Sequence, residues 1–137
     1  MAHDSDEELT AHYQQYATHF RPIITKTPDN SWRAQYPEVQ WYVVADTQAA
    51  AGEAILEEAL RRIDAGDPHA QPPHDILARH LQQAIPGVYA LDQELFLYLR
   101  TRAGVTETQA AFEEAERRRA AGQSYTLADY LTEQEHP

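Results

Sequence analysis

The sequence predicts an α+β fold, in which a small three-stranded antiparallel sheet with a covering helix is followed by a helical C-terminal half. Two patterns lead to this prediction. Residues 20–45 contain short β-branched and aromatic segments separated by turn residues, which is typical of strands. From residue 48 onward, apolar residues recur every three or four positions, which is typical of amphipathic helices. The 137 residues suffice for one ordinary domain.

The three strands are expected at residues 20–27, 31–36 and 41–45. The first is rich in β-branched residues and ends at a Pro-Asp-Asn turn. In the second, aromatic and small residues alternate with polar ones, so one face of it is expected to be buried. The third is an unbroken apolar run, and we expect a central strand that is buried on both faces.

A helix is expected at residues 48–65, directly after the third strand. Asp46-Thr47 supplies side-chain oxygens that can cap its first turn, and Gly66 can adopt the left-handed conformation that closes a helix. The helix is expected to pack on the sheet through one apolar stripe. Its members are Leu56, Ala59, Leu60 and Ile63.

Four further helices are expected in the C-terminal half, at residues 75–84, 92–102 and 106–119 and after Thr126. Leu91, Leu95 and Leu99 recur at a spacing of four, which predicts a buried face for the second of these. Residues 106–109 match a capping box that would open the third. The predicted organisation is an acidic tail with a short helix (1–19), a sheet-plus-helix core (20–66), a proline-rich linker (67–73) and a helical region (74–137).

The charge balance indicates which partners the chain can bind. It carries 11 Lys and Arg against 22 Asp and Glu, a net charge of −11, which repels phosphate backbones and attracts basic proteins. Direct binding of nucleic acid is therefore not expected. There is no cysteine, no signal peptide and no apolar run long enough to span a membrane, so we expect a cytoplasmic protein without membrane contact.

No cluster of residues indicates catalysis, and the chain is not expected to be an enzyme. His69, His74 and His80 lack the close spacing of a metal-binding pair, so no metal site is predicted. The five glycines stand mostly at helix ends rather than in a phosphate-binding loop, and no cofactor is expected.

Residues 20–60 resemble the HicB-type antitoxin domain of bacterial toxin–antitoxin modules. The resemblance lies in Tyr36-Pro37-Glu38-Val39, in Asp46-Thr47 and in Glu58-Ala59-Leu60, which follow one another as in that family. The chain has Gln40-Trp41 where the family usually has a Pro-Gly step. The resemblance implies a partial RNase H-like fold and an antitoxin that neutralises a small basic toxin by steric occlusion.

Residues 112–131 also look like the helix-glycine-helix tails of RelB- or Phd-type antitoxins. Together with the acidic charge, this similarity suggests helices that order on a basic partner. The expected partner-binding residues are Phe112, Tyr125, Leu127, Tyr130, Leu131 and Trp41. A homodimer is also expected, because an exposed edge strand in a three-stranded sheet must be paired or covered.

Two other functions remain open from the sequence. The first is a DNA-binding transcriptional autoregulator, in which residues 98–119 would contain a helix-turn-helix with its turn at 103–106. The second is a nuclease, as the RNase H-like resemblance implies, but only Asp29, Glu38 and Asp46 lie near the predicted strand ends, and such chemistry needs several converging carboxylates.

Overall fold

The computed structural model describes residues 6–135, which form two compact units with a buried apolar cluster each. Within this range, unit 1 contains residues 6–19, 77–84 and 88–135, and unit 2 contains Phe20–Ile76 and Ile85–Gly87. The first five residues of the predicted acidic tail and the last two residues lie outside the described range. The predicted α+β class, with a three-stranded antiparallel sheet and a helical C-terminal half, is confirmed.

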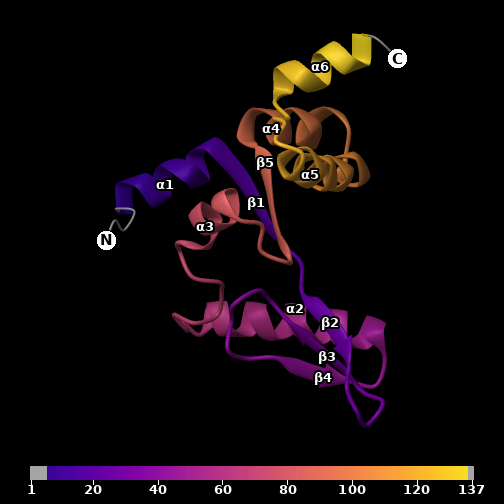
Figure 1. The fold of residues 1–137 in the computed structure, drawn as a ribbon. Coiled ribbons are helices and arrows are strands. Elements are labelled where there is room, and N and C mark those ends of the chain that lie inside the picture. Colours follow the sequence, from indigo (N-terminus) through magenta and orange to yellow (C-terminus); the bar gives the residue numbers. More distant parts are fainter. Residues whose placement is uncertain (1–5, 136–137) are drawn as a thin grey trace. The chain divides into compact units, whose positions relative to one another are not determined.

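Unit 2 is built from three strands and one long helix. These elements are β2 (Ile23–Lys26), β3 (Trp32–Gln35), β4 (Val43–Ala45) and α2 (Gln48–Asp64). The strands are antiparallel in the order β2-β3-β4, and Ala34 of β3 stands opposite Ile24 on one side and Val43 on the other. Helix α2 packs across one face of this sheet (Figure 1).

The third strand differs from the sequence prediction in place and in burial. It covers only Val43–Ala45 and lies at an edge of the sheet, and the side chain of Val44 is 53% exposed. Trp41 precedes the strand and is buried in the cluster of unit 2. A continuous apolar run can be a strand covered on both faces or a loop with one large side chain buried, and the sequence pattern does not distinguish the two. Here the first part of the run, with Trp41, belongs to the loop before β4.

The two ends of α2 form as the sequence predicts. Thr47 Oγ1 accepts a hydrogen bond from the amide of Ala50 at 3.0 Å, which satisfies one of the free amides of the first turn. Gly66 has a φ of 74°, and the amide of Asp67 donates to the carbonyl of Arg62 at 2.9 Å. This is the Schellman closure that glycine favours, because it carries no Cβ to oppose a positive φ.

The buried face of α2 is not the predicted one. Ala51, Ile55 and Ala59 face the sheet, whereas Leu56, Leu60 and Ile63 are exposed. Of the predicted stripe, only Ala59 is buried. The helix is turned by roughly one residue toward its smaller side chains, because alanines allow a helix to approach a sheet more closely than leucines do.

Unit 1 is mostly helical. Its elements are α1 (Asp6–Gln15), β1 (Tyr16–Phe20), most of α3 (Ile76–Gln82), β5 (Val88–Asp92), α4 (Gln93–Arg102), α5 (Val105–Ala120) and α6 (Leu127–Glu135). Strands β1 and β5 form a two-stranded sheet that the sequence analysis did not anticipate. The strand predicted at 20–27 forms at Ile23–Lys26 as β2 and is shorter than expected. Phe20 instead ends β1, because the chain then passes through Arg21-Pro22, where proline cannot donate to a ladder.

The core of unit 1 contains the leucines that the sequence placed at a spacing of four. Leu91, Leu95 and Leu99 are all at most 1% exposed, and they pack with Ala111, Phe112 and Ala115 of α5. The predicted capping box at 106–109 is wrong. Helix α5 begins at Val105 without a side-chain cap, and Thr108 Oγ1 instead donates back to the carbonyl of Gly104 at 2.7 Å.

The proline-rich segment after α2 packs within unit 2. Ala70 is 3% exposed, and Trp41 Nε1 donates to the carbonyl of His69 at 3.0 Å. None of the helices within residues 6–135 combines the length and the apolar character that crossing a lipid bilayer requires.

Candidate functional site

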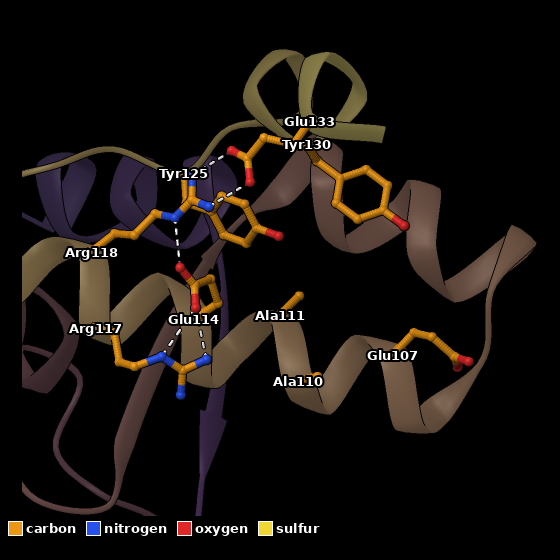
Figure 2. Close-up of a pocket in the computed structure, with 9 residues that line it drawn as sticks. All are labelled: Glu107, Ala110, Ala111, Glu114, Arg117, Arg118, Tyr125, Tyr130 and Glu133. Carbon is orange, nitrogen blue, oxygen red and sulfur yellow. Dashed lines mark hydrogen bonds and ion pairs between the residues drawn. The ribbon is translucent and has the colours of Figure 1, made fainter. Parts of the chain in front are cut away.

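A shallow groove of about 470 Å³ lies along α5 and α6 in unit 1, in the region where the sequence places most of the partner-binding residues. Figure 2 shows its lining side chains projecting from both helices and from the segment that joins them. The lining residues are Glu107, Ala110, Ala111, Glu114, Arg117, Arg118, Tyr125, Tyr130 and Glu133. The groove combines charged and aromatic groups and has no deep apolar chamber.

Arg118 lies at one end of this groove, opposite Glu107 (Figure 2). Its Nε donates to Glu114 Oε2 at 2.7 Å, and its two terminal nitrogens donate to the carboxylate of Glu133 at 2.7 and 2.6 Å. Its guanidinium also lies 4.2 Å from the ring centre of Tyr125. These contacts hold the pKa of both carboxyls below their usual range and raise the pKa of Arg118, so the groove contains fixed charges.

The chain reaches α6 through a reciprocal cap. The amide of Asp129 donates to Thr126 Oγ1 at 3.2 Å, and the amide of Thr126 donates to Asp129 Oδ2 at 2.9 Å. The predicted cap at Thr126 is therefore confirmed. Tyr130 then meets Tyr98 of α4 edge-on at 6.0 Å, and the amide of Leu127 donates to Asp92 Oδ2 at 3.3 Å.

The six predicted partner-binding residues do not share one surface. Phe112 is 3% exposed and contacts the rings of Phe96 and His19, and Trp41 belongs to the cluster of unit 2. Tyr125, Leu127 and Tyr130 are half-buried against the core of unit 1. Leu131 is the most exposed of the six, at 38%. Helix α6 as a whole has no buried residue.

Unit 1 contains a buried polar network that was not predicted from the sequence. His80 Nε2 lies 2.8 Å from Glu116 Oε1, while Glu116 Oε2 accepts from the amide of Ala90 at 2.9 Å and from Arg119 at 2.6 Å. Arg119 also donates to the carbonyl of Ala90 at 2.9 Å. One sequence feature could have indicated this network. His80 stands three residues after Leu77 on an otherwise apolar helix face, where a histidine needs a polar partner.

This network fixes three elements of unit 1 to one another. It connects α3, β5 and α5 through charge-assisted hydrogen bonds that are largely shielded from water. The carboxylate is already bound by its neighbours on both oxygens, which leaves it poorly placed to act on a substrate. We therefore interpret the network as structural.

The basic run at Arg117, Arg118 and Arg119 is engaged within the unit. Arg117 pairs with Glu114 at 2.7 Å, and the other two arginines make the contacts described above. Over residues 6–135, no three histidine or carboxylate side chains gather in a way that could hold a metal ion. Asp29 is held by the hydroxyl of Thr27 in the turn between β2 and β3.

Comparison of the chain with protein-family models, with curated proteins and with solved structures finds no significant match.

Proposed function

We propose that this protein is an antitoxin-like binding module that neutralises a small basic partner protein by covering it, without making or breaking a bond. The observation that carries the proposal is the distribution of charge. Most basic side chains contact a carboxylate or an aromatic ring of the chain, while exposed carboxylates such as Glu53, Glu57 and Asp64 form no ion pair within residues 6–135.

The contacts that the basic residues make within their own units support this proposal. Five arginines, 61, 62, 117, 118 and 119, form ion pairs with carboxylates of their own unit. Lys26, Arg33 and Arg102 lie over the aromatic rings of Trp32, Tyr42 and Tyr98. With a net charge of −11, the surface that remains favours encounters with cationic proteins.

The arrangement of unit 2 is compatible with the HicB-type resemblance. Three antiparallel strands lead into one covering helix, in the order that the resemblance implies. Pro37-Glu38 forms the turn after β3, and Thr47 caps α2, so two of the quoted motifs occupy defined structural positions. An antitoxin acts where its toxin acts, and the proposal therefore places the protein in the cytoplasm.

The alternative of a DNA-binding autoregulator receives less support. The two helices around the expected turn at 103–106 are α4 and α5, and the arginines at the end of α5 are engaged by carboxylates. A recognition helix needs such side chains free to reach base edges.

The test is co-expression with the small basic protein encoded beside the gene of this chain. We expect that neighbour alone to arrest growth, and co-expression to relieve the arrest through a complex that survives size-exclusion chromatography. The absence of such a neighbour, or a neighbour that neither arrests growth nor binds, would contradict the proposal. Metal-dependent cleavage of nucleic acid by the purified chain would contradict it as well.

A further inference from the structure

Helix α2 carries an exposed apolar stripe on the side that does not face the sheet. Leu56, Leu60 and Ile63 are spaced four and three residues apart, so they share one helix face over two turns. Their side chains are 53%, 55% and 44% exposed. We call these three residues the α2 stripe. Large apolar residues that gather on one exposed face mark interaction surfaces more often than isolated ones do.

The packing of unit 2 does not use this stripe. The helix is held on the sheet by Ala51, Ile55 and Ala59, which are at most 8% exposed. Each of the three exposed side chains keeps about half of its surface in water and so forgoes part of the free energy that full burial would provide. A partner that covers the stripe can gain part of this free energy.

An acidic ridge runs along one side of the stripe. Its members are Glu53, Glu57 and Asp64, all exposed, and the helical period places them next to Leu56 and Leu60. Within residues 6–135 none of the three forms an ion pair. Glu58 differs, because Arg61 and Arg62 bind its carboxylate and lower its pKa to about 2. The ridge therefore keeps its charge available for a cation from outside.

We propose that the α2 stripe docks an amphipathic helix of a basic partner protein. The apolar anchors of that helix would pack on Leu56, Leu60 and Ile63, and its lysines or arginines would reach the acidic ridge. This inference rests on the proposed function for the basic nature of the partner, and it adds the surface and the secondary structure that are recognised.

A helix fits this surface better than an extended segment does. The stripe is a ridge of side chains spaced by helical turns, and such a ridge packs against the grooves of a second helix. It spans about 10 Å along the axis, which corresponds to two turns of a partner helix. An extended segment would bind by its main chain to a sheet edge, and α2 offers no free main-chain groups along its length.

The test uses the full chain and a defined probe, an 18-residue helical peptide of leucines and lysines with one apolar face. Binding is measured by titration calorimetry, and the site is mapped by amide chemical shifts. We expect the largest shifts in α2. Leu60→Gln is expected to weaken binding about tenfold, because it places a polar amide at the centre of the apolar contact, where the residues that carry most of the binding free energy cluster. The matched control is Leu97→Gln, at an exposed leucine of α4 (47% exposed), which is expected to change the affinity less than twofold.

The contribution of charge is tested separately. The double variant Glu53→Gln, Glu57→Gln is expected to weaken binding severalfold and to reduce its salt dependence. A peptide in which glutamates replace the lysines is expected not to bind. Because the substituted side chains are exposed, thermal melts of all variants are expected to match the parent, which excludes unfolding as the cause.

The outcomes separate this inference from the proposed function. Binding that maps outside α2 and is unaffected by Leu60→Gln overturns the inference while leaving a basic partner in place. Failure of both the peptide and the encoded basic neighbour to bind overturns both proposals. Dimerisation of the chain that Leu60→Gln abolishes would identify a second copy as the occupant, and it would also overturn the inference.

Discussion

His80 Nε2 and Glu116 Oε1 lie 2.8 Å apart in the interior of unit 1, and they join α3 to α5. The side chain of His80 is 1% exposed, and that of Glu116 is 20% exposed. Both oxygens of Glu116 are engaged, since Ala90 and Arg119 donate to the second one. The stability of unit 1 should therefore depend on this carboxylate.

Glu116→Gln is expected to lower the free energy of unfolding by about 2 kcal/mol, because it removes the charge that Arg119 and His80 face in a poorly hydrated site. Urea denaturation followed by far-ultraviolet circular dichroism measures this change. Glu107→Gln, an exposed change on the same helix, serves as the control and should stay within about 0.5 kcal/mol of the parent. Equal effects of the two substitutions would refute a structural role for the network.

The same carboxylate should make stability depend on pH. Burial raises the pKa of Glu116, but hydrogen bonds from His80, Ala90 and Arg119 outweigh burial and hold the pKa below its ordinary value of 4.5. The unfolded state then binds the proton more tightly than the folded state does. The stabilisation from Glu116 is therefore complete above pH 4.5 and is lost as the pH falls through the lower folded value.

Denaturation series between pH 7 and pH 3 check this expectation. Other carboxyls with lowered pKa values, including Glu114 and Glu133, will also contribute to the loss in acid. The relevant quantity is therefore the difference between the parent and Glu116→Gln, which should shrink as the pH falls. A difference that stays constant down to pH 3 would show that the ionised carboxylate is not responsible.

Arg118 should control the docking of α6. Its replacement by Gln removes the contacts to Glu114 and Glu133 and the contact with the ring of Tyr125. Since α6 has no buried residue, we expect hydrogen exchange at Leu127–Glu135 to become severalfold faster while α4 keeps its protection. Arg117→Gln is the control, because it removes only the ion pair with Glu114, and it should have little effect on hydrogen exchange in α6. Unchanged hydrogen exchange in both variants would mean that the aromatic contacts alone hold α6 in place.

Gly87 should be the least replaceable glycine of unit 2. Its φ is 84°, and an added Cβ would lie 2.7 Å from the carbonyl oxygen of Arg21 and 2.7 Å from Pro37 Cγ. Gly87→Ala combines backbone strain with a steric clash and should cost about 3 kcal/mol. Gly122 has a φ of 76° and no atom within 4 Å of such a Cβ, so Gly122→Ala isolates the strain and should cost about 1 kcal/mol.

Thermal unfolding of the two alanine variants measures this contrast. Equal losses would mean that the close approach of Arg21 and Pro37 does not constrain position 87.

Features that depend on neighbouring residues could be predicted from the sequence. The cap at Thr47, the closing Gly66 and the cap at Thr126 form as expected, because each needs hydrogen bonds only to residues within one helical turn. The burial of Leu95 and Leu99 likewise followed from their spacing. Burial at the candidate site did not follow from the sequence, because the residue types of Phe112, Trp41 and Tyr125 do not reveal that the first two are buried and the third is half-buried.

The sequence by itself therefore determined the α+β class, the order of most elements and the acidic surface. The tertiary structure decided that β1 pairs with β5, that α2 turns its alanines inward, and that His80 meets Glu116. The physical reason is the separation along the chain. Periodicity and caps are local, but pairing between distant segments depends on packing and desolvation in three dimensions, which a one-dimensional pattern does not record.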